Sequence, residues 1–229
     1  MVRVTKRGKA NREIARQVKG PAPITDAVRI LKSFKAPKFD QTVEICVHLG
    51  IDPRQSEQQL RGSISMPRGV GRTARVICFC GPDVVAAAKS AGAVEAGGAE
   101  LVKKIEDGWM EFDVAVASPD MMRTVSKLGR VLGPKGLMPS PKAGTVTPDV
   151  VPAVKEYGAG RLEYRNDDGG NIHCILGKMS FPDEHIVENF DHFISTIQKA
   201  RPPTAKGQYI RKCVISGTMT PGVQIAVQA

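Results

Sequence analysis

The chain has 229 residues, of which 41% are apolar and 24% are charged, a composition typical of globular domains with hydrophobic cores of their own. Its apolar runs all fall short of the roughly 18 residues that a membrane-spanning helix needs, so we expect a soluble protein that does not bind membranes. The formal net charge of +10 and the isoelectric point of about 9.5 favour an anionic partner.

The positive charge is concentrated at the N-terminus. Residues 1–20 hold seven Lys/Arg and one acid, Glu13, which leaves a net charge of only +4 for the rest of the chain. We predict from this a basic N-terminal arm that contacts nucleic-acid phosphates, with a solvated tail as the alternative. A transit peptide is a further alternative, although the segment lacks serine, and it has no apolar stretch of the kind found in secretory signals.

The five cysteines are odd in number and have unrelated spacings, which favours a reducing cytosol over a disulfide framework. Cys78 and Cys80 could form half of a zinc site, but no second Cys/His pair stands at the spacing of a zinc finger. We therefore expect no metal, and we expect both thiols on one face of a buried strand.

The first part of the chain predicts one helix and two strands. The helix covers 24–34, with Thr25 or Asp26 as its cap and Pro37 beyond its end. Residues 42–50 alternate between an apolar and a polar face, as expected of a strand that is buried on one side. The apolar face holds Val43, Ile45, Val47 and Leu49, and the polar face holds Thr42, Glu44, Cys46 and His48. A second strand is predicted over 60–66.

The middle of the chain has a different pattern from about Pro67 onward. Continuous apolar runs over 74–80 and 112–118 predict strands that are covered on both faces. Helices are expected between and after these strands, over 82–92, 99–108, 119–129 and 147–160. Alternation of this kind is typical of βα units around a mostly parallel sheet.

The last part of the chain returns to an antiparallel pattern. Strands are expected over 161–165 and 171–176, paired around the turn NDDGG, and an amphipathic helix over 181–200. Strands over 209–219 and 223–227 follow. We therefore predict a split α+β terminal domain, 21–66 with 160–229, built on an antiparallel sheet with helices. An α/β domain, 67–159, is inserted into it, and the crossings at 66–70 and 157–160 act as a hinge.

An inserted parallel sheet raises the alternative of a nucleotide-dependent enzyme, but the motifs do not support it. GVGRTA, residues 69–74, precedes a strand, whereas a dinucleotide fingerprint must follow a strand and open a helix. GRVLGPKG lacks the Gly-Lys-Ser/Thr of a phosphate-binding loop, and Pro134 removes a backbone donor. No Ser/His/Asp set has the spacing of a nucleophile elbow. We predict a protein that is not an enzyme and needs no cofactor.

The segment SKLGRVLGPKGLMPSPKAGTV, residues 126–146, contains four glycines, three prolines and no acid. Its four basic residues are Lys127, Arg130, Lys135 and Lys142. We interpret it as a long, structure-poor surface loop that contacts RNA or DNA phosphates, because such loops inside compact domains are usually functional. A connector between βα units is the alternative.

The same segment resembles the signature of the bacterial large-subunit ribosomal protein L1 family. Further segments resemble the family in the same order: KFDQTVEICVHLGIDPR, GWMEFDVAVASPDMM, RNDDGGNIHCILGKMSF and SGTMTPGV. The resemblance implies an inserted domain that is Rossmann-like, three-layered and without a nucleotide. It also implies a cytoplasmic, ribosome-bound protein, monomeric outside the ribosome. Such a protein binds large-subunit rRNA, forms the mobile stalk near the tRNA exit site, assists release of deacylated tRNA and represses its own mRNA.

The resemblance places RNA contacts on ten residues: Lys38, Phe39, Thr42, Glu44, Arg165, His173, Lys178, Ser180, Thr218 and Met219. The sequence departs from the family at Thr220, where glycine is usual, and at Gln224, where a basic residue is usual. Glu44 lies on the predicted polar strand face, where its carboxylate could accept a hydrogen bond from a ribose 2′-OH or a base amino group. A protein that coats single strands without specificity remains an alternative.

Overall fold

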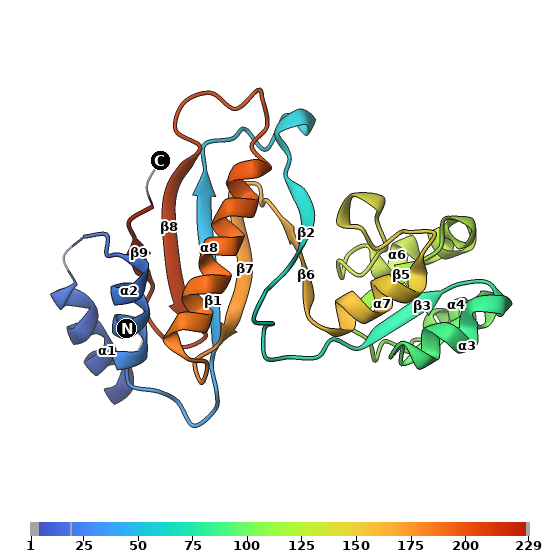
Figure 1. Cartoon of the computed structure of the whole chain (residues 1–229), viewed down its shortest axis with the longest axis horizontal. Helices are drawn as coiled ribbons and strands as arrows, with labels where there is room; N and C mark the ends of the chain where they lie inside the picture. The colour runs from blue at the N-terminus through green and yellow to red at the C-terminus, as the bar shows by residue number, and fades with distance from the viewer. Residues whose placement is uncertain (1–4, 19, 228–229) are drawn as a thin grey trace. The chain divides into compact units, whose positions relative to one another are not determined.

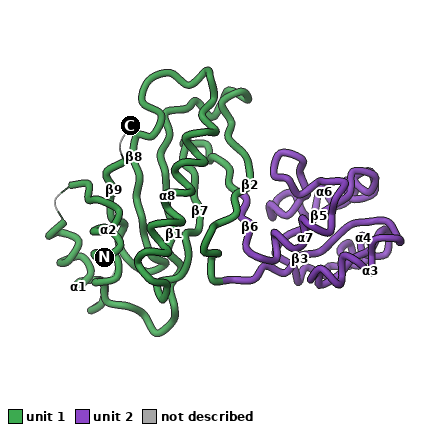
Figure 2. The backbone as a smooth tube through the Cα atoms, in the orientation of Figure 1, with its two compact units in different colours: residues 1–71, 164–229 green, residues 72–163 purple. Residues whose placement is uncertain are grey.

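The computed structural model describes residues 5–18 and 20–227. It confirms a mixed α/β protein with both antiparallel and parallel sheets (Figure 1). The chain divides into two compact units, residues 1–71 with 164–229 and residues 72–163 (Figure 2). In the part of the chain that is described, no helix is long and apolar enough to cross a membrane.

The first unit contains a four-stranded antiparallel sheet in the order β7-β1-β8-β9. Its strands are β1 (Thr42–Leu49), β7 (Asn171–Lys178), β8 (Ile210–Gly217) and β9 (Val223–Ile225). Helices α2 (Ile24–Ser33) and α8 (Asp183–Lys199) pack against the sheet. The predicted alternation of β1 is confirmed, because its apolar residues are all buried while Glu44 is exposed. The polar face of the sheet is therefore the open one.

The N-terminal residues form helix α1 (Lys6–Gln17), so the predicted basic arm is largely helical. The Thr5 hydroxyl accepts a hydrogen bond from the Gly8 amide at 3.2 Å and caps this helix. Helix α2 begins after Pro23 without a side-chain cap, so the predicted cap at Thr25 or Asp26 is wrong.

The predicted pairing of 161–165 with 171–176 is wrong. Strand β6 (Arg161–Arg165) pairs with β2 (Arg61–Ser65), and β7 pairs with β1. Only a single bridge, Asn166 to Ile172, crosses the NDDGG turn. A short 3₁₀ turn, η1 (Ser56–Gln58), precedes β2.

The second unit contains a three-stranded parallel sheet in the order β4-β3-β5. Its strands are β3 (Val76–Phe79), β4 (Glu95–Gly97) and β5 (Val114–Ala117). Helices α3 (Pro82–Ser90) and α7 (Val150–Gly158) share one hydrophobic cluster with Cys78 and Cys80, as predicted for these thiols. Helix α4 (Ala99–Glu106) packs on the other face, with Ile77 and Phe79.

Residues 119–146 are more helical than was predicted. The expected helix over 119–129 is present as an unbroken succession of short 3₁₀ and α-helical segments that continues to Leu132, whereas the expected structure-poor loop contains helical turns and buried anchors. These elements are η2 (Pro119–Met121), α5 (Met122–Val125), η3 (Ser126–Leu128), α6 (Gly129–Leu132) and η4 (Pro141–Ala143). Leu128 and Leu132 are fully buried, and the Tyr157 hydroxyl donates to the Ala143 carbonyl at 2.7 Å. The segment is therefore fixed to its own unit.

Candidate nucleic-acid interface

Three distant chain segments meet where β1 begins and β7 and β8 end. We call residues 38–42, 178–180 and 217–220 the sheet-end site. Several hydrogen bonds join its first and last segments. Among them, the Thr42 amide donates to the Thr218 hydroxyl, and the Thr218 amide donates to the Thr42 carbonyl, each at 3.1 Å. The predicted contacts Thr42 and Thr218 are thus direct neighbours.

A buried glutamine completes the connection between these segments. Gln41 is only 1% exposed, and its side-chain oxygen accepts a hydrogen bond from the Met219 amide at 2.9 Å. The Gln41 carbonyl accepts another from the Met179 amide, also at 2.9 Å. Sequence reasoning missed Gln41, because its partner lies 178 positions away in the chain.

The segment after β7 is held by two further contacts. The Lys178 ammonium donates to the Thr42 hydroxyl at 2.9 Å. The Asp40 carboxylate accepts from the Ser180 hydroxyl at 2.8 Å and from the Ser180 amide at 3.2 Å. Asp40 was also missed, since an acid is not an obvious part of a phosphate-binding surface.

Two large apolar side chains of the sheet-end site face solvent. Phe39 is 50% exposed and Met219 is 52% exposed. Lys38, Ser180 and Thr218 are exposed beside them. Exposed aromatic and thioether groups next to cations and hydroxyls can bind a ligand that has flat faces, hydroxyls and negative charge together.

Other predicted residues lie farther from this end. Glu44 follows two residues along β1, opposite Ile175 on β7 and Ser216 on β8, and it is exposed on the open face. His173 lies another row away, with its Nε2 atom 4.0 Å from the Cys46 sulfur and 3.8 Å from the Asp167 carboxylate. Arg165 is exposed on β6 and belongs to a different sheet.

Thr220 is accommodated in the turn that carries Thr218. Its hydroxyl accepts a hydrogen bond from the Gly217 amide at 2.8 Å, and its own amide donates to the Gly217 carbonyl at 3.1 Å. None of the non-glycine residues described has a positive φ, so the threonine introduces no backbone strain here. The Thr220 side chain, which a glycine would lack, therefore helps to close the turn. Gln224 lies on β9 beyond it.

The basic residues of 126–146 are on the second unit. Lys127, Arg130, Lys135 and Lys142 are all exposed, while Leu128 and Leu132 between them are buried. Because the backbone is anchored, these cations project from a fixed surface. Among the residues that the structure describes, no group of three or more His, Cys, Asp or Glu is arranged to hold a metal ion.

A basic chain that presents exposed aromatic, hydroxyl and cationic side chains at one end of an open sheet has the features of a nucleic-acid-binding protein. The model of the ribosomal protein L1p/L10e family matches residues 31–221, and the chain belongs to this family. It is therefore a structural, ribosome-bound protein that binds rRNA, and its family is not an enzyme family. The match contains every residue of the sheet-end site, whereas α1 lies before it.

Proposed function

We propose that the sheet-end site binds a folded segment of large-subunit rRNA, and that the protein thereby forms the mobile stalk near the tRNA exit site. The observation that carries this proposal is the convergence of Thr42, Lys178 and Thr218 through direct hydrogen bonds. A surface built from three distant segments has a fixed shape, and RNA is recognised largely by shape and by its 2′-hydroxyls.

Each side chain supports a particular contact. Lys38 and Lys178 attract phosphates, and Phe39 and Met219 pack on ribose or on a base face. The Thr218 oxygen, which already accepts from the Thr42 amide, retains a lone pair for a 2′-hydroxyl. The exposed Glu44 carboxylate accepts from a 2′-hydroxyl or a base amino group, which favours RNA over DNA. His173 and Arg165 extend contacts beyond the sheet-end site.

The inserted α/β domain has a separate role in this proposal. We infer for it a Rossmann-like, three-layered fold, because α3 and α7 pack in one cluster with the parallel sheet and α4 packs in the other. The exposed cations Lys127, Arg130, Lys135 and Lys142 contact RNA phosphates and assist the release of deacylated tRNA. The terminal domain, 21–66 with 160–229, remains on the rRNA.

The same surface would account for repression of the protein's own mRNA. A messenger that folds into the shape of the rRNA site would compete for the sheet-end site, and no further ligand is needed. Outside the ribosome the protein would act as a cytoplasmic monomer.

The proposal is tested by comparing affinity for a full-length large-subunit rRNA transcript with affinity for random-sequence RNA at physiological salt. We expect Phe39→Ala and Met219→Ala to weaken rRNA binding and to leave binding of random RNA unchanged. Val94→Ala is a matched control, because Val94 is 49% exposed and belongs to the other unit. Equal affinity of the wild type for both RNAs would contradict the proposal and favour a coating protein. Calorimetry with NAD or ATP tests the enzyme alternative.

A further inference from the structure

Helix α1 presents two different faces. Residues 11, 14, 15 and 18 share one face by helical spacing and are buried or half-buried. Lys9, Arg12 and Arg16 share another face with the acid Glu13, and all four side chains are exposed. We call the three cations the α1 stripe. The spacing brings three cations together within about two helical turns.

The helix is attached to the body of its unit from the inner face. Asn11 is buried, its side-chain oxygen accepts from the Lys35 amide at 2.8 Å, and its side-chain nitrogen donates to the Lys35 carbonyl at 3.4 Å. Beyond the helix, the Ala22 amide donates to the Gln224 carbonyl at 3.0 Å, and Ala22 pairs with Ile225 of β9. A contact within the helix and a contact in the segment after it thus hold α1 in place.

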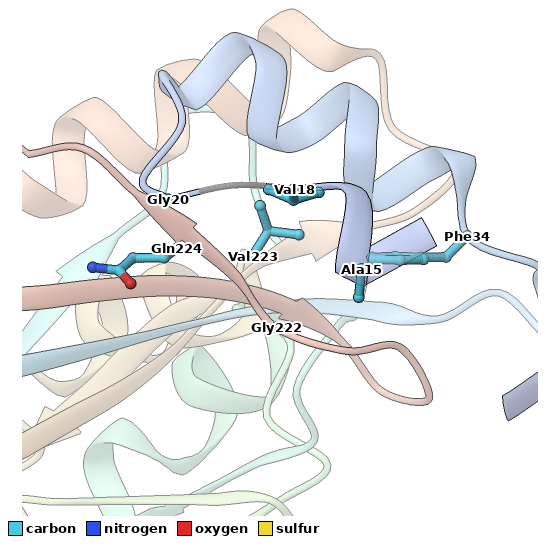
Figure 3. A pocket seen from close by; sticks show the side chains of 7 residues that line it. All are labelled: Ala15, Val18, Gly20, Phe34, Gly222, Val223 and Gln224. Carbon is cyan, nitrogen blue, oxygen red and sulfur yellow. The ribbon is translucent and has the colours of Figure 1, made fainter. Parts of the chain in front are cut away.

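These contacts connect α1 to the two segments that flank the sheet-end site in the chain. Ala15 and Val18 line a pocket of about 170 Å³ together with Phe34 and the segment 222–224 (Figure 3). That segment follows the turn that carries Thr218 and Met219. On the other side, Lys35 is three residues before Lys38, and both lysines are exposed. The α1 stripe and the sheet-end site are therefore parts of one unit, joined by two short segments.

We propose that the α1 stripe is a second RNA-binding surface, which contacts the phosphate backbone of the RNA seated on the sheet-end site. This inference rests on the proposed function. Three exposed cations at fixed positions match a run of phosphates, and phosphate contacts position RNA without reading its sequence. A lipid surface is a poorer fit, because the inner face of α1 is already packed against protein.

The decisive comparison is between removing the charges and releasing the helix. The variant K9Q/R12Q/R16Q keeps Asn11, while Asn11→Ala keeps every charge and loses both contacts to Lys35. We expect both variants to bind the large-subunit rRNA transcript roughly tenfold more weakly at low salt, and the triple variant to lower the slope of log K against log salt by about two. Glu13→Gln, which removes an exposed acid from the same helix, should not weaken binding.

The outcomes separate the possible failures. If the triple variant binds like the wild type, the α1 stripe does not contact RNA. If the triple variant binds RNA weakly but Asn11→Ala binds normally, the cations do not need the attachment of α1 to the body of its unit. The proposal of a fixed RNA-binding surface on α1 would then be wrong. Absence of wild-type binding to rRNA would instead overturn the proposed function.

A second measurement covers the case in which Asn11→Ala does not fold. Hydroxyl-radical footprinting of the rRNA should show one discrete stretch of backbone that the wild type protects and the triple variant leaves exposed. Identical footprints for the two proteins would overturn the inference.

Discussion

The Lys178 ammonium donates a hydrogen bond to the Thr42 hydroxyl at 2.9 Å, and the two residues are direct partners in the antiparallel pair of β7 and β1. This contact fixes a half-buried cation at the start of the strand whose polar face is open. Because the ammonium has three donors, two remain for a phosphate.

We therefore predict that Lys178→Ala weakens rRNA binding by about ten- to a hundredfold, since a hydrogen bond to a charged group contributes about 1.5–3 kcal/mol. The salt slope should fall by about one, as expected for one phosphate contact. Filter binding at several salt concentrations measures both quantities. Lys103→Ala, which removes an exposed lysine from α4, should change neither. A loss of the same size for both variants would show that only net charge matters.

Two glycines before the second unit allow a test of how Lys178 is positioned. Gly71 has a φ of +71°, and a Cβ there would lie 2.7 Å from the Lys178 Cγ atom. Gly69 has a similar φ of +65°, but a Cβ would meet nothing within 4 Å. Either Gly→Ala change should cost about 1–2 kcal/mol of stability through backbone strain. Only Gly71→Ala should also weaken RNA binding.

A double-mutant cycle checks this interpretation of Gly71. In a Lys178→Ala background, Gly71→Ala should have little further effect on RNA affinity, because the side chain that it displaces has been removed. Additive losses would mean that Gly71 acts independently of Lys178.

Asn189 is a buried polar residue on α8 whose loss should destabilise the first unit. It is 0% exposed. Its side-chain oxygen accepts a hydrogen bond from the Arg68 amide at 3.1 Å. Its side-chain nitrogen donates to the Gly69 carbonyl at 3.0 Å and to the Leu176 carbonyl at 2.7 Å. Asn189→Ala leaves these groups unpaired, so the free energy of unfolding should fall by about 2–4 kcal/mol. Urea denaturation measures it, with the exposed Gln198→Ala as control. Equal midpoints would contradict the prediction.

The cysteines differ in their accessibility to thiol reagents. Burial raises the pKa of Cys174 and of Cys213 to about 12, whereas Cys46 is half-exposed on the open sheet face. Burial and the Asp167 carboxylate also raise the pKa of Cys46, so its labelling should be slow near neutral pH and accelerate as pH rises. We expect Cys46 to be labelled first in the native protein and to be protected by rRNA. Peptide mass spectrometry of the labelled protein, with and without rRNA, measures the labelling of each cysteine. Undiminished labelling of Cys46 in the complex would show that RNA leaves the polar face of the sheet open.

Local sequence patterns correctly predicted the elements that bury one face and expose the other. The alternation of β1 and the amphipathic spacing of α8 were sufficient, because each has one face on the core. Pairing of β6 with β2 was not predictable from these patterns, since a nearby turn made a local hairpin the simpler expectation. The anchors of 126–146 were missed because the glycines and prolines suggested a loop, whereas Leu128 and Leu132 supply the packing.

The candidate site shows the same division between local and distant information. Spacing placed Thr42 and Glu44 on the open face, but only the family resemblance suggested Thr218, Met219 and Lys178. The hydrogen bonds of Asp40 and Gln41 depend on partners more than a hundred residues away, which no local pattern records. The boundaries of the two domains and the RNA contacts themselves stay predictions.

The central claim is that the sheet-end site holds one folded segment of large-subunit rRNA. The most direct test is to crosslink the full chain to RNA in cell lysate, to recover it and to sequence the attached RNA at nucleotide resolution. We predict that reads concentrate in a single segment of large-subunit rRNA and that peptides containing Phe39 or Met219 carry the crosslinks. Reads spread evenly over unrelated RNAs, or crosslinks confined to the other unit, would contradict the claim.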